Sequence, residues 1–200
     1  MLLNFDKFTY ILPLKMLIPT LGNNNTYCQD NDLNYYSWDD EDETKYQFLE
    51  FVKTIILIRK KEAVLQRRKH FHGTPSKFSG IKDISWYHPE GRDLTAEEWN
   101  NPSNQSMMYV LEGTSIDELS QDGKRIIGDT LLVLINGQFN DVKFVLPPHR
   151  SRYPWALLMV TSQKHPKLGQ LYNSGEEFNL QDHSMAVLCL FQTKQRERKA

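Results

Sequence analysis

The sequence predicts a mainly β protein in which an antiparallel β-sandwich follows one long amphipathic helix. Two observations carry this prediction. From about residue 73 onward, short apolar runs alternate with turn signals, which is typical of sandwiches built from many short strands. Before that point, apolar residues recur at helical spacing. The 200 residues are 40% hydrophobic and 12% aromatic, which is enough for a packed core.

The helix is expected to begin at a capping box, with Thr44 as the N-cap and Gln47 reaching back to it. Acidic residues 39–43 precede this start and basic residues 59–61 lie near the end, an order that complements the helix dipole. One apolar stripe needs a partner surface: the sandwich, a second chain, or another part of a larger domain. The stripe consists of Phe48, Phe51, Val52, Ile55 and Ile58.

Five apolar runs are expected to form strands. Turn signals such as Asp122-Gly123 and Asn136-Gly137 separate them. In one run Val142, Phe144 and Leu146 alternate with mostly polar residues, so one face of that strand should be buried. The last run is apolar throughout, which predicts cover on both faces. The runs are residues 107–111, 131–135, 142–146, 156–160 and 185–191.

Composition narrows the classes of partner and compartment. The formal net charge of −1 provides no general attraction to nucleic acid or to an anionic membrane. Cys28 and Cys189 lie far apart and make no disulfide framework, which favours a reduced, cytoplasmic protein with Cys189 as a buried core thiol. The apolar segment 8–21 is interrupted by charge and proline, so neither a membrane span nor an export signal is expected.

A polar loop precedes the helix and carries three consecutive amides. It reads Gly-Asn-Asn-Asn-Thr-Tyr-Cys-Gln-Asp-Asn over residues 22–31. Amides and carboxylates bond well to hydroxyl groups, since an amide both donates and accepts and a carboxylate accepts. The loop therefore indicates a hydroxyl-rich ligand such as a sugar.

Several landmarks in one order resemble the bacterial isoamylase-type glycogen debranching enzymes over about residues 22–192. The polar loop differs from the family's loop only by Thr26 in place of alanine, and Trp38 follows it. Residues 84–94 and Trp99 are similar to the family's Trp-x-x-Pro-Asp-Gly-x-x-Met segment followed by tryptophan. Weaker matches continue at Glu112-Gly113, Gly128-Asp129, residues 132–136 and Phe144-x-Leu146-Pro147.

The resemblance implies a fragment of a two-domain glycoside hydrolase. Such enzymes of the α-amylase superfamily have a (β/α)8 barrel followed by an antiparallel β-sandwich, and hydrolyse α-1,6-glucosidic branch linkages in glycogen or limit dextrin. Residues 1–21 would be an atypical lead-in. Residues 22–72 would be the remnant of the catalytic barrel, with its last loop up to residue 43 and its last helix over 44–69. Residues 73–200 would be the C-terminal β-sandwich domain.

Because active sites of such barrels lie on the loops that follow the strands, the polar loop would line the sugar cleft. The resemblance thus implies an α-glucan partner and no cofactor. The substrate-binding candidates are Asn24, Asn25, Tyr27, Gln29 and Asp30.

The catalytic carboxylates of the family are not expected in this sequence. Retaining hydrolysis requires two carboxylates about 5–5.5 Å apart. The family carries them on earlier barrel strands, and this sequence contains none of those motifs. We therefore predict that the chain alone is inactive and acts as structural and substrate-cleft support. Residues 4–21 stand where the family has a Gly-Asp-Glu motif, so we expect a truncated or frame-disrupted remnant of a longer gene.

The alternative interpretation is a stand-alone carbohydrate-binding or assembly module. This interpretation would use Trp86, Tyr87 and Trp99 as aromatic platforms for a sugar. Large aromatics are buried on average, however, which favours a structural role for them. His70, His72 and His88 lack the further ligands of a metal site, and no metal is predicted.

An exposed helix stripe would predict aggregation or dimerisation through Phe48, Val52 and Ile55. The partner would then be a second copy of the chain or the missing barrel segment. A monomer in light scattering at high concentration would contradict self-association.

Overall fold

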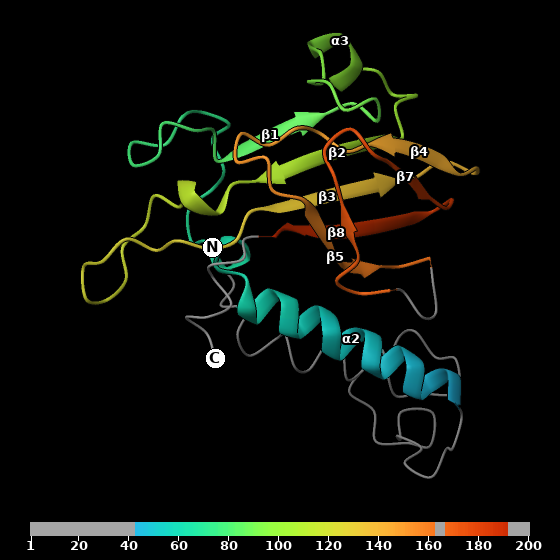
Figure 1. Cartoon of the computed structure of the whole chain (residues 1–200), viewed down its shortest axis with the longest axis horizontal. Coiled ribbons are helices and arrows are strands. Elements are labelled where there is room, and N and C mark those ends of the chain that lie inside the picture. The colour runs from blue at the N-terminus through green and yellow to red at the C-terminus, as the bar shows by residue number, and fades with distance from the viewer. Residues whose placement is uncertain (1–42, 163–166, 192–200) are drawn as a thin grey trace, which may run out of the picture. The chain divides into compact units, whose positions relative to one another are not determined.

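The computed structural model describes residues 43–162 and 167–191 (Figure 1). The chain forms two compact units, Met1–Ile58 and Arg59–Ala200. The described helices are α2 (Glu43–Lys61), α3 (Ala96–Trp99) and the 3-10 helices η2 (Ala63–Gln66) and η3 (Gly113–Ser115). The described strands are β1 (Ile84–Tyr87), β2 (Ser106–Leu111), β3 (Leu131–Asn136), β4 (Val142–Val145), β5 (Trp155–Val160), β6 (Leu171–Tyr172), β7 (Glu177–Leu180) and β8 (Ser184–Leu190).

Helix α2 confirms the predicted helix but corrects both of its ends. It begins at Glu43, so Thr44 is itself helical and the prediction of Thr44 as N-cap is wrong. It ends at Lys61 rather than at residue 69, because Glu62 adopts an extended conformation. The chain then turns back, and the Gln66 side-chain amide donates to the Lys60 carbonyl at 2.7 Å, which satisfies one of the free carbonyls of the last turn.

The apolar stripe of α2 is partly exposed. Phe48 and Ile55 are 42% and 38% exposed, and the rings of Phe48 and Phe51 stack at 6.4 Å. Self-association through this stripe stays a prediction. No helix in the described ranges is long and apolar enough to cross a membrane.

The strands form two antiparallel sheets, in agreement with the predicted mainly β class. Within the described ranges, the larger sheet has six strands in the order β1-β2-β3-β8-β5-β6, and β4 pairs with β7 in the smaller sheet (Figure 1). All five predicted runs are strands. Strands β1, β6 and β7, which have only two to four residues each, and the single-turn helix α3 were not predicted from the sequence.

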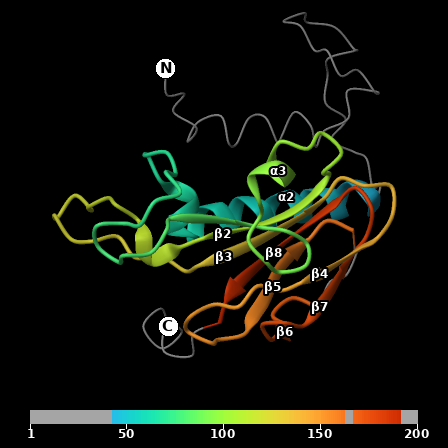
Figure 2. The ribbon, with the colours of Figure 1, turned by 90° about the horizontal axis from the view of Figure 1, so that it is seen from above.

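The main core lies between the two sheets. Strands β4 and β7 lie together on one side of the larger sheet (Figure 2), and Phe144, Leu146 and Phe178 pack there against side chains of β2, β3, β5 and β8. Phe144 and Leu146 are fully buried while Lys143 is exposed, which confirms the predicted alternation. Each large apolar side chain buried in this way contributes about 1.5–3 kcal/mol.

A second, smaller core includes residues from before the predicted sandwich. Val64 of η2 packs with Leu111, Ile116 and Leu131, all at most 5% exposed. Cys189 only borders this cluster and is half-buried, so its prediction as a buried core thiol is wrong. The alternation along β8 turns its neighbours Leu188 and Leu190 toward the main core instead. The predicted domain boundary at residue 73 stays a prediction.

Candidate functional site

The predicted sugar-binding residues Asn24, Asn25, Tyr27, Gln29 and Asp30 lie outside the described residues, and their role stays a prediction. In the ranges that the structure describes, no three His, Cys, Asp or Glu side chains come together in a way that could hold a metal ion. The candidate sites within those ranges are the polar and aromatic clusters of the sandwich.

The first cluster is a row of three aromatic rings at the edge of the larger sheet. Trp86 of β1 lies opposite Tyr109 of β2 in the strand register, with ring centroids 5.1 Å apart. On its other side Trp86 meets Trp99 of α3 edge to face at 4.8 Å. Trp86 and Tyr109 are half-buried, whereas Trp99 is 53% exposed. Tyr87, the third aromatic singled out in the sequence, packs against the main core.

An ion-pair network fixes the loop that carries Trp99. Arg92 donates to both carboxylate oxygens of Glu98, at 2.9 and 2.5 Å, and to Glu90 at 3.1 Å. The backbone N–H of Thr95 also donates to Glu98, and the Thr95 hydroxyl accepts from the Glu98 N–H, which completes a capping box. These bonds to Arg92 and Thr95 lower the pKa of Glu98 to about 2. The Thr-x-x-Glu pattern of residues 95–98 is a sequence signal for this short helix, although the helix was not predicted.

The second cluster surrounds a buried carboxylate at the end of β2. Glu112 is 4% exposed and accepts from the hydroxyls of Thr114 at 2.7 Å and Thr130 at 3.0 Å. Its other oxygen lies 3.1 Å from His149 Nε2. The Ser151 N–H donates to His149 Nδ1 at 3.2 Å, so the ring proton belongs on Nε2, where it donates to Glu112. The network ties loop 147–154 to β2.

This network predicts acid sensitivity. Burial raises the pKa of Glu112, but the bonds from His149, Thr114 and Thr130 outweigh it and lower the pKa from 4.5 to about 2. A depressed folded-state pKa contributes stability that is present above about pH 4.5 and is lost as the pH falls toward 2. We expect Glu112→Gln to lower the free energy of unfolding by about 2 kcal/mol at pH 7 and to flatten its fall between pH 5 and 2.

Urea unfolding at a series of pH values measures this effect. The exposed Glu97 serves as the matched control, since Glu97→Gln should leave the pH profile unchanged. Parallel profiles for wild type and Glu112→Gln would contradict the assignment.

The third cluster joins the segment after α2 to the sandwich. The side chains of Arg67 and Asp83 are 3% and 5% exposed and pair at 3.0 Å. Asp83 also accepts from the backbone N–H groups of His72 at 3.0 Å and Gly73 at 2.9 Å, and the Arg67 guanidinium lies 4.3 Å over the Phe71 ring. Among the described residues, Arg67 Nε and Nη1 have no hydrogen-bond partner.

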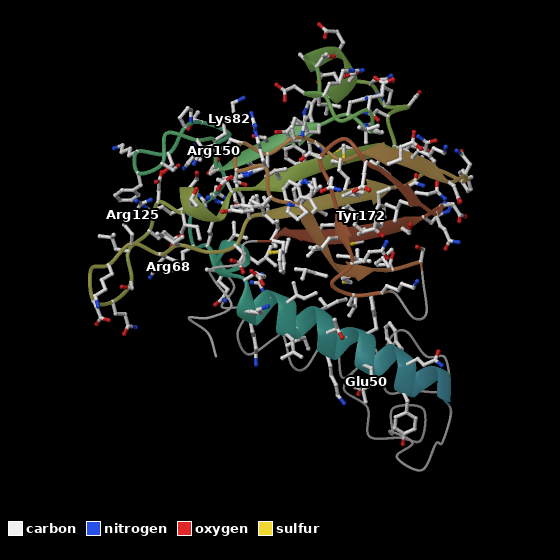
Figure 3. All side chains as sticks on the ribbon, viewed as in Figure 1. Glu50, Arg68, Lys82, Arg125, Arg150 and Tyr172 are labelled. Carbon is white, nitrogen blue, oxygen red and sulfur yellow. The ribbon has the colours of Figure 1, made fainter. Side chains whose placement is uncertain are left out.

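Two shallow grooves lie beside this segment. One, of about 290 Å³, is lined by residues 66–68 and 118–121 among others, and the other, of about 510 Å³, is lined by residues 68–69 and 117–119 together with Lys77 and Phe78. Arg68 and Glu118 pair at 3.0 Å and line both grooves. Arg68 and Arg125 both lie toward this end of the sandwich (Figure 3). Because the Arg68 charge is paired with Glu118, the grooves at this end of the sandwich are not an open binding site for an anion.

Comparison with known proteins places the sandwich in a family. Residues 83–190, more than half of the chain, match the family model "Isoamylase, C-terminal". The "Glycogen operon protein GlgX homolog" of Mycobacterium tuberculosis is 29% identical over 168 residues, which cover 84% of this chain and 23% of that protein. The "Isoamylase" of Pseudomonas amyloderamosa is 28% identical over 135 residues, covering 66% of this chain and 15% of the relative.

A solved structure supports the same fold. The pullulanase from Bacillus acidopullulyticus superposes with a TM-score of 0.50 at 12% identity, covering 88% of this chain and 17% of the pullulanase. The chain thus spans less than a quarter of the length of these relatives.

Proposed function

Since the chain belongs to the isoamylase C-terminal family, we propose that it is the C-terminal, non-catalytic portion of a glycogen debranching enzyme. The complete enzyme would hydrolyse α-1,6-glucosidic branch linkages in glycogen or limit dextrin, in the cytoplasm. The observation that carries the proposal is the family match over residues 83–190, together with the similarity to the mycobacterial glycogen operon protein homolog.

The role that we propose for each segment of the chain follows from the sequence landmarks of the family. Residues 22–43 would contribute the last barrel loop to the substrate cleft, with Asn24, Asn25, Tyr27, Gln29 and Asp30 on the glucan side. Residues 44–72 would end the barrel, and the sandwich would support it. The Arg67–Asp83 and Arg68–Glu118 pairs support such a role, because they hold the segment after α2 against the sandwich.

A graft tests the proposal. In the mycobacterial relative, the segment aligned with residues 83–190 is replaced by those residues of this chain. We expect the graft to hydrolyse limit dextrin with kcat/KM within about tenfold of the parent, a loss of at most about 1.4 kcal/mol of transition-state stabilisation. The parent with this segment deleted should be inactive. The 200-residue chain alone should release no reducing sugar, because no acid/base pair can be assigned in it.

The second candidate function is a stand-alone carbohydrate-binding module. The half-exposed Trp99 favours it over a purely structural role for that residue.

A further inference from the structure

Trp99 is a large apolar ring that the fold presents to solvent. Trp99 is 53% exposed at the end of the four-residue helix α3, and its ring meets that of Trp86 on the edge strand β1 of the larger sheet. It stands edge to face on Trp86 with an interplanar angle of 64°, and Trp86 in turn leans on Tyr109. Trp86 thus packs against one side of Trp99, and more than half of the Trp99 surface stays exposed.

The backbone under Trp99 is held in place before any ligand arrives. The Leu94 N–H donates to the Trp86 carbonyl at 3.1 Å, which joins the loop to β1, and the Trp99 N–H donates to the Thr95 carbonyl at 2.9 Å. The two bonds from Arg92 to Glu98 close the loop between them. A platform ordered in advance loses less conformational entropy on binding.

The polar groups around the platform point to a neutral ligand. Glu90 and Glu98 both face the single guanidinium of Arg92, and His88 lies 3.9 Å from Glu98. With two carboxylates for one arginine, the rim disfavours a phosphate or another anion. Carboxylate, guanidinium and the nearby Asn100 amide offer both acceptors and donors, which suits hydroxyl groups.

We propose that Trp99 and Trp86 form a binding surface for a linear α-glucan. The C–H face of one glucosyl ring packs on the Trp99 indole, an amphipathic ring suited to a half-wet contact, while its hydroxyls meet the Arg92–Glu98 rim. The choice of α-glucan rests on the proposed function, whereas the site itself rests on the aromatic row and its polar rim.

Isothermal titration of the full 200-residue chain with maltoheptaose tests this surface. We expect saturable binding that Trp99→Ala weakens at least about tenfold and Trp99→Phe weakens by about threefold or less, since phenylalanine keeps an aromatic face. Phe139, which is 84% exposed on a different loop, provides the matched control, and Phe139→Ala should bind as wild type does. Because Trp99→Ala also removes the edge-to-face contact with Trp86, the variant should still unfold cooperatively but at a midpoint a few degrees below that of wild type.

Three results would overturn the surface: no saturable binding by wild type, unchanged affinity in Trp99→Ala, or equal binding of cellohexaose, whose β-linked chain has a different shape. Loss of binding in Asp30→Ala but not in Trp99→Ala would place the glucan on the polar loop and would also overturn it. The graft assay reads debranching independently, so a failed surface and a failed proposed function are distinguishable.

Discussion

Gly113→Ala is expected to lower the free energy of unfolding by about 3–4 kcal/mol, the largest single effect that the fold predicts. Gly113 follows the buried Glu112 at the start of η3, and its carbonyl accepts from the Gly128 N–H at 2.9 Å. A Cβ at residue 113 would overlap the backbone carbonyl oxygens of both Gly128 and Asp129. Backbone atoms cannot rotate aside as a side chain can. The segment at Gly113 and the segment at Gly128 and Asp129 cross closely, and they would have to move apart.

Thermal unfolding measures the effect, and the midpoint should fall by about 10 °C. Gly123→Ala is the matched control. Gly123 has open space around its α-carbon and a φ of +72°, so alanine there adds only the cost of a left-handed conformation, about 1–2 kcal/mol. Equal losses in the two variants would show that the Gly113 crossing is not as close as the structure describes.

Asp83→Asn is expected to lower the free energy of unfolding by about 3 kcal/mol, the second large effect. The change keeps the size of the side chain and one acceptor oxygen for the His72 and Gly73 N–H groups. It removes the charge opposite Arg67, and a buried guanidinium without a counter-ion is strongly destabilising. Urea unfolding at pH 7 gives the value.

A double-mutant cycle isolates the ion pair. Arg67→Met combined with Asp83→Asn should recover part of the loss, because the uncompensated charge is gone. The exposed pair Lys143–Glu177, at 3.2 Å, is the matched control, and Glu177→Gln should be close to neutral. Additive losses in the Arg67 and Asp83 variants would contradict a direct coupling.

The sequence predicted the fold where periodicity was long enough to read. The helical stripe and the five apolar runs appear as α2, β2, β3, β4, β5 and β8. Shorter strands could not be predicted from the sequence, since β6 has two residues and β7 alternates over only four. The predicted ends of α2 were wrong because the Thr-x-x-Gln pattern lies inside the helix, and because the chain becomes extended at Glu62 and ends the helix early.

The polar clusters were beyond the sequence for a different reason. Glu112, His149 and Ser151 are joined only when β2 and loop 147–154 come together in the folded chain. Arg67 and Asp83 meet across 16 residues with no motif between them. The exposure of Trp99 likewise depends on where α3 lies against β1, whereas the sequence alone favoured burial of a tryptophan.

The graft of residues 83–190 into the mycobacterial relative is the most direct measurement of the central claim. The account predicts that the grafted enzyme hydrolyses limit dextrin and that Gly113→Ala in the graft lowers the temperature at which this activity is lost. A graft that unfolds cooperatively at the parent's temperature but releases no reducing sugar would contradict the claim that this sandwich does the work of a debranching enzyme's C-terminal domain.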